Sequence, residues 1–192
     1  MRKFIFTFIT LFFSQLVSFS DEMKFDNETY TLKFSALAPQ TQGYGNEYFK
    51  KDEDVSNWTK MIGVYYYPNE KSPLEFAKNF DNTIENTDNS ILLKIVENKK
   101  NDKAVLSFLV NGSENSKNFF EYDVYKFEKH PQNGMIVSKY ASKHFFKNND
   151  EISKIAQDIK ENNDKYLELL IVSQTPAVLE KDIGLKKQNT NN

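Results

Sequence analysis

Apolar and polar residues alternate along several segments of the chain, which is typical of β-strands with one buried face. The first segment is Glu28–Phe34, and we predict that a short strand over Asn46–Lys50 and a longer one over Trp58–Tyr67 follow it. The intervening segment Ala38–Gly45 contains a proline and two glycines. We expect a loop there, because these residues interrupt strand pairing or permit positive φ.

The second half of the chain has the same alternation in four segments, which predicts two hairpins. Ile91–Glu97 is expected to pair with Ala104–Val110, and Phe119–Lys129 with Met135–Phe145. The turn of the second hairpin contains an Asn-Gly pair, whose residues accept left-handed backbone angles. The polar segment Asn111–Asn118 is expected to be a loop that joins the two hairpins.

Helical spacing of apolar residues predicts one helix between the strands and another after them. The first begins at Pro73, with Ser72 as its cap and Glu75 completing a capping box. The second begins near Asn149, and we favour its continuation over Tyr166–Val172, with a further strand as the alternative. Strands and helices in this order predict an α+β fold, in which an antiparallel β-sheet has two main helices packed on it.

The first residues of the chain follow a third pattern, in which two basic residues precede an apolar run. Arg2 and Lys3 precede a run from residue 4 to residue 19, which is shorter than the roughly 20 apolar residues of a membrane span. This order is typical of a secretory signal peptide. Ser18 and Ser20 suit a cleavage site, so we predict cleavage after Ser20, with an uncleaved signal anchor as the alternative. The predicted division is a signal peptide over 1–20, a single α+β domain over 21–185 and a disordered polar tail over 186–192.

The composition limits which cellular compartment and which classes of partner we expect. The chain has no cysteine, so the exported domain would be stabilised by its core without disulfides. Loss of Arg2 and Lys3 leaves 23 basic residues against 27 acidic ones, a formal charge of −4. This mild excess gives no reason to expect binding to nucleic acid or to an anionic membrane. We expect a periplasmic or secreted monomer with no membrane span after cleavage, whose partner is an unknown protein or small molecule of the cell envelope.

Residue types that commonly carry catalysis or bind metals are sparse. The chain has two histidines, His130 and His144, and no cysteine, so we expect no metal site and no cofactor. The sequence contains no Gly-x-Ser-x-Gly motif, and we predict no catalytic residue. Glu121 and Asp123 share one face of a predicted strand, which we interpret as a solvated face and not as a pair for acid–base chemistry.

The most distinctive segment joins an acidic-aromatic pair to the single tryptophan. Glu47 and Tyr48 are followed about ten residues later by Trp58, within the sequence Trp-Thr-x-Met-Ile. This arrangement resembles a motif of uncharacterised secreted bacterial proteins, which implies no activity. The order of elements also resembles the sheet-and-helix sandwich of the PsbP photosystem accessory proteins, which implies a binding or assembly role. The candidate binding residues are Glu47, Tyr48, Trp58 and His144.

These observations favour an exported, non-catalytic binding or accessory protein. One alternative is a hydrolase with a site assembled from distant loops, for which Glu47, His144 and a serine would have to meet within hydrogen-bond distance. A second alternative is an envelope structural protein that oligomerises through an exposed strand edge, because unpaired backbone groups recruit another strand. The aromatic segment Phe119–Phe127 is the candidate edge.

Overall fold

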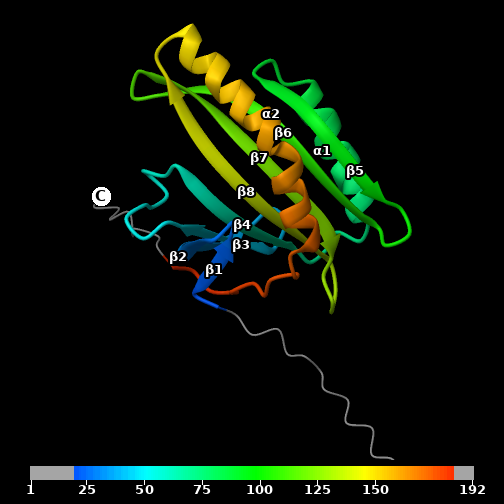
Figure 1. Ribbon diagram of the computed structural model, residues 1–192. Helices are drawn as coiled ribbons and strands as arrows, with labels where there is room; N and C mark the ends of the chain where they lie inside the picture. Colours follow the sequence, from blue (N-terminus) through cyan, green and yellow to red (C-terminus); the bar gives the residue numbers. More distant parts are fainter. Residues whose placement is uncertain (1–19, 184–192) are drawn as a thin grey trace, which may run out of the picture.

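The computed structural model describes residues 20–183, which form one antiparallel sheet with a helix on each face (Figure 1). The elements are β1 (Glu22–Phe25), β2 (Glu28–Ala38), β3 (Gly43–Phe49), β4 (Lys60–Tyr67), α1 (Pro73–Glu85), β5 (Ser90–Asn98), β6 (Lys103–Glu114), β7 (Lys117–Lys129), β8 (Met135–Phe146) and α2 (Asn149–Val172). The strand order is β1-β2-β3-β4-β8-β7-β6-β5. The predicted α+β fold, an antiparallel sheet with two packed helices, is therefore confirmed.

The two helices cover opposite faces of the sheet, with α2 in front and α1 behind in Figure 1. Successive residues of a strand point to opposite faces, so Leu106 packs in the core beside α1 and the preceding Val105 packs in the core beside α2. The main contacts of α1 are with β5, β6 and β7. On the same face of the sheet, the part that β2, β3 and β4 form is not among the main contacts of α1.

Local sequence explains where each helix begins. The Ser72 hydroxyl accepts a hydrogen bond from the backbone N–H of Glu75, and Pro73 occupies the first turn, where no backbone donor is needed. Asn148 caps α2 by accepting from the Glu151 N–H at 3.0 Å. This helix continues unbroken to Val172, so the favoured helical interpretation of its last turns is confirmed.

The loop expected over Ala38–Gly45 is shorter than predicted, because half of these residues belong to strands. β2 extends to Ala38 and β3 begins at Gly43, so only residues 39–42 form the connection. The predicted loop was too long because a glycine can pair in a ladder where a close neighbour excludes a side chain. A Cβ on Gly43 would lie 1.8 Å from the Tyr66 carbonyl oxygen. The short strand β1, which pairs with β2, was not predicted.

The loop expected over Asn111–Asn118 is also wrong. β6 and β7 continue through this segment as one long hairpin, closed by Asn115 and Ser116. These two residues have φ values of 50° and 63°, the left-handed angles that close a two-residue turn. Polar composition was misleading here, since the outer ends of these strands pair through their backbones and need no apolar side chains.

The strand that was expected to offer a free edge lies inside the sheet. β7, which contains Phe119–Phe127, pairs with β6 on one side and with β8 on the other. The edges among the described strands are β1 and β5. The hypothesis of association through the aromatic strand is therefore wrong.

The predicted signal peptide, up to residue 19, and the predicted tail over 186–192 lie outside the described residues. Neither of the helices described within residues 20–183 combines the length and apolarity that a membrane-spanning helix requires.

Candidate functional site

A group of charged side chains lies on the α1 side of the sheet. The ammonium of Lys139 on β8 lies 3.0 Å from Oε1 of Glu121 and 3.0 Å from Oδ1 of Asp123, both on β7. The exposed fractions of these side chains are 10% for Lys139, 20% for Glu121 and 3% for Asp123. A single lysine thus pairs with two carboxylates in a largely desolvated position.

The strand register places a third carboxylate, that of Glu47, beside this group. Glu47 on β3 lies opposite Gly63 on β4, and Gly63 lies opposite Lys139 on β8. The three residues therefore form one row across the sheet, on the same face. We call Glu47, Glu121, Asp123 and Lys139 the charged row cluster.

Tyr65 on β4 completes the cluster. Its hydroxyl donates a hydrogen bond to Oε1 of Glu47 at 3.1 Å. The phenol reaches Glu47 by lying over Gly63, where a Cβ would lie 2.6 Å from the tyrosine oxygen. A Cβ on Gly45 would lie 3.1 Å from the ring. The two glycines thus make room for the tyrosine against the sheet.

Burial controls the protonation of the cluster. It raises the pKa of Asp123 to about 7, although the neighbouring Lys139 ammonium acts in the opposite direction. Burial also raises the pKa of Glu47, against the effects of the Tyr65 hydrogen bond and of Lys139. Burial alone would lower the pKa of Lys139, but Asp123 and the neighbouring tyrosines raise it well above its ordinary value. The lysine is therefore charged near neutral pH, and an added cation would favour the ionised carboxylates.

A hollow of about 320 Å³ adjoins Tyr65 at the β2–β3–β4 end of the same region. Small residues such as Ala36 and Gly45 leave space in it, and aromatic side chains such as Phe34 and Tyr67 line it. Tyr65 lines this hollow and also donates its hydrogen bond to Glu47 of the charged row cluster. Tyr65 therefore connects the aromatic hollow to the Glu47 carboxylate, which does not itself line the hollow.

The cluster carries more negative than positive charge. Its three carboxylates face one ammonium, and the next lysine on β8, Lys143, forms its ion pair with Glu114 at 2.9 Å. Such a group attracts an ammonium or guanidinium ion. Within residues 20–183, no group of three or more histidine, aspartate or glutamate side chains is arranged to hold a metal ion.

The sequence interpretation of this region was partly wrong. Glu121 and Asp123 are not on a solvated face, because α1 and the neighbouring tyrosines lie on the same side of β7. Lys139 and Tyr65 were not singled out at all. A usable pattern did exist, since Lys139 alternates with Val137 and thus occupies a position where period two predicts a core residue.

The four predicted binding residues divide between the two faces. Glu47 lies in the charged row cluster, and the adjacent Tyr48 points to the α2 core and is buried there. Trp58 lies on the Glu47 face but packs with Phe49 and neighbouring apolar residues, under the Lys143 ammonium at 4.4 Å. His144 lies on the α2 side of β8, in line with the core residue Tyr140. The structure therefore does not bring these four residues together.

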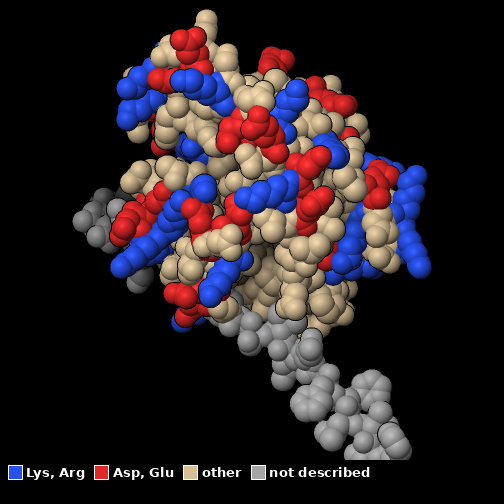
Figure 2. Space-filling model, viewed as in Figure 1, with Lys and Arg blue, Asp and Glu red and all other residues tan. Residues whose placement is uncertain are grey.

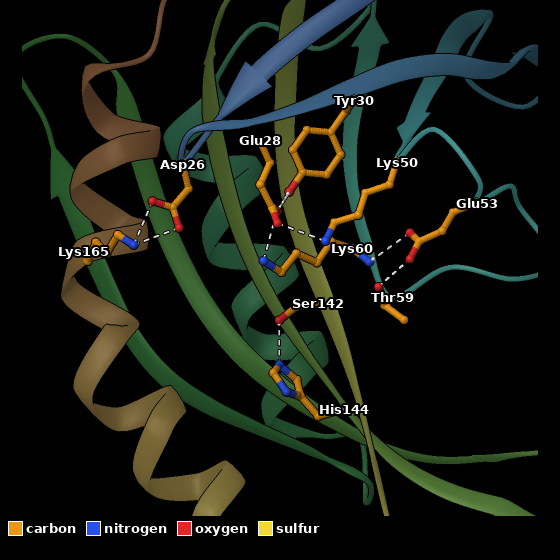
Figure 3. A network of polar contacts seen from close by, with 10 residues as sticks. All are labelled: Asp26, Glu28, Tyr30, Lys50, Glu53, Thr59, Lys60, Ser142, His144 and Lys165. Atoms are coloured by element: carbon orange, nitrogen blue, oxygen red, sulfur yellow. Dashed lines mark hydrogen bonds and ion pairs between the residues drawn. The ribbon is translucent and has the colours of Figure 1, made fainter.

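His144 belongs to a polar region at the end of the sheet that Figure 3 shows. Its Nε2 lies 2.8 Å from the Ser142 hydroxyl, and burial lowers the pKa of the imidazole. Nearby, the Glu28 carboxylate binds the ammonium groups of Lys50 at 3.0 Å and Lys60 at 2.9 Å (Figure 3). These contacts join the end of β3 and the starts of β2 and β4.

The Ser142–His144 pair does not form the site that the hydrolase alternative requires. Glu47 lies on the opposite face of the sheet from both residues. Ser142 is also buried within β8, whereas a catalytic serine must present its hydroxyl to the substrate.

Residues 17–175 match the model of a recognised family of uncharacterised proteins. No curated protein and no solved structure matches the chain.

Proposed function

We propose that this chain, which belongs to that family, is an exported, non-catalytic binding or accessory protein of the periplasm or the cell exterior. Its ligand is a small molecule or a protein side chain with a cationic group, bound at the charged row cluster. The sequence supports export through its signal-peptide pattern. The PsbP-like arrangement is part of the same proposal and is supported by the helices on both sheet faces. The resemblance of the Trp-Thr-x-Met-Ile segment to secreted proteins is proposed from the sequence alone.

The observation that carries the proposal is the environment of Glu47. Its carboxylate is partly desolvated and receives a hydrogen bond from a neutral phenol, that of Tyr65. The nearest ammonium, that of Lys139, is already paired with Glu121 and Asp123. A ligand cation would therefore supply the positive charge that Glu47 lacks.

The adjoining hollow indicates what the cation is attached to. Its volume of about 320 Å³ lies at the lower end of the roughly 300–1,000 Å³ typical of small-molecule pockets. The aromatic residues Phe34, Tyr65 and Tyr67 line it. Aromatic faces attract cations and stack on planar groups, so an amine joined to an aromatic or short apolar body fits best.

Calorimetric titration of the secreted chain with benzylamine, benzyl alcohol and benzoate tests the proposal. We expect heat of binding with benzylamine only, because its two analogues replace the cation with a neutral group and an anion. Glu47→Gln should weaken benzylamine binding about tenfold or more, since a hydrogen bond to a charged group contributes roughly 1.5–3 kcal/mol. The exposed Glu168, on α2 and far from the cluster, provides the matched control Glu168→Gln, which should bind normally.

Equal binding of benzyl alcohol, or a Glu47→Gln variant that binds like the wild type, would contradict the cationic site. Export is tested separately by mass spectrometry of the protein recovered from its native host. A mature chain that begins at Asp21 is expected, and an intracellular chain that begins at Met1 would contradict export.

A further inference from the structure

A second cavity, of about 600 Å³, lies on the α2 side of the sheet. It is bounded by the last turn of α2 and by the end of the β5–β6 hairpin. Val96 and Val105 lie opposite each other on these two strands and line the cavity together with Ile171 of α2. Ile171 is 45% exposed and the next residue, Val172, is 76% exposed. We call this cavity the α2 groove.

The α2 groove has lysines at one end. Lys99, Lys103 and Lys126 line it, and Lys100 follows in the hairpin turn. Figure 2 shows lysine side chains gathered at the right of the molecule, over the β5–β6 turn. The groove is therefore apolar beside α2, and at the turn three lysines and one carboxylate, that of Glu97, line it.

Ion pairs neutralise only part of this basic end. The buried carboxylate of Glu128 binds Lys103 at 2.6 Å and Lys126 at 2.8 Å. Glu97 lies 4.0 Å from the highly exposed Lys99. With Lys100 included, lysines outnumber carboxylates at this end, so it complements an anionic group.

We propose that the α2 groove binds a fatty acid, independently of the function proposed for the other face. The acyl chain lies against Val96, Val105 and Ile171, and it removes the exposed apolar surface of Val96 and Ile171 from water. The carboxylate lies at the hairpin turn, beside Lys99 and Lys100. The lysines thus bind the anionic end of the ligand, and the apolar lining binds its hydrocarbon end.

Pairing of a strand from another chain with β5 is a less suitable use of this region, although β5 is an edge of the sheet. The pairing of β5 with β6 shifts register between Leu92 and Lys94. Lys94 also turns toward α2, where its ammonium binds Asp164 at 2.7 Å. A bulge and an edge lysine are features that oppose further strand pairing, so the groove beside the edge is the better docking surface.

The test is calorimetric titration of the secreted chain with decanoate and with decyltrimethylammonium, both below their critical micelle concentrations. We expect decanoate to bind and the cationic analogue to bind at least tenfold more weakly. Ile171→Asn should weaken decanoate binding at least tenfold. Val55, at 49% exposed, lies in a loop outside the groove, so Val55→Asn is the matched control and should leave binding unchanged.

A charge variant tests the basic end. Lys99→Gln combined with Lys100→Gln should weaken decanoate binding severalfold and reduce its dependence on salt. Lys154→Gln combined with Lys160→Gln, two exposed lysines of α2, should have no such effect. Thermal unfolding of each variant confirms that it is folded.

Four results would overturn the proposal. The first is equal binding of the two detergents, and the second is decanoate binding that Ile171→Asn leaves intact. The third is light scattering that shows concentration-dependent association abolished by Ile171→Asn, because a second copy of the chain would then occupy the groove. Binding to phospholipid vesicles without binding to free decanoate would likewise exclude the fatty acid.

Discussion

Replacement of Glu28 by glutamine should destabilise the protein in a pH-dependent way. The Glu28 carboxylate on β2 binds the ammonium groups of Lys50 at 3.0 Å and Lys60 at 2.9 Å and accepts a hydrogen bond from the Tyr30 hydroxyl at 2.8 Å (Figure 3). Glu28→Gln keeps the size of the side chain but removes its charge. The two lysines, from the end of β3 and the start of β4, then lose their shared partner.

The size of the effect follows from the pKa of Glu28. Burial alone would raise this pKa, but the contacts with Lys60, Lys50 and Tyr30 outweigh burial and lower the pKa from 4.5 to about 2. At 1.36 kcal/mol per pKa unit, the full shift corresponds to about 3 kcal/mol. The Glu28 side chain is 34% exposed, and water screens its ion pairs. We therefore expect Glu28→Gln to lower the free energy of unfolding by about 1–2 kcal/mol at pH 7.

The pH dependence has a definite sign. Since the folded-state pKa of Glu28 is lowered, its contribution is complete above the ordinary value of 4.5 and is lost as the pH falls through about 2. Urea unfolding of the wild type and of Glu28→Gln should thus differ at pH 7 and converge at the acid end. Glu168→Gln, at an exposed position of α2, should match the wild type throughout. A Glu28→Gln effect that stays constant from pH 7 to pH 2 would refute the ion-pair explanation.

Three other substitutions test the packing. Lys126→Met should cost about 3 kcal/mol in urea unfolding, because it removes one cation from the fully buried carboxylate of Glu128. Gly63→Ala should push Tyr65 away from the sheet, since the new Cβ would lie 2.6 Å from the tyrosine oxygen; we expect a loss of about 1–3 kcal/mol and weaker benzylamine binding by calorimetry. Ile159→Ala should cost about 2–4 kcal/mol in the same unfolding assay, because this residue of α2 is buried in the core.

The elements that could be predicted from the sequence are those that neighbouring residues specify. The capping residues before α1 and the apolar spacing of α2 act within one or two turns of helix, so both helices begin where expected. The Asn-Gly turn between β7 and β8 is equally local, and Gly134 there has a φ of 77°. In contrast, the connection between β6 and β7 depends on pairing along whole strands, which the polar residues at their ends do not reveal.

Strand order could not be predicted, because it depends on contacts between distant segments. The sheet follows the sequence except at one junction, where β4 pairs with β8. That pairing makes β8 an inner strand and leaves β5 as an edge, whereas β7 is an inner strand through its pairing with β6 and β8. The same lack of information explains why the aromatic segment Phe119–Phe127 was taken for an exposed edge: its composition is the same whether or not a strand lies on each side.

The candidate cationic site depends on that same junction. Glu47 and Lys139 are far apart in the chain and become neighbours in one row only because Gly63 on β4 faces Lys139 on β8. The first half of the sheet contributes Glu47 and the second half contributes Lys139 and Asp123. A ligand cation that neutralises Glu47 would therefore stabilise the pairing of the two halves as well as its own binding, because both rely on the same desolvated charges.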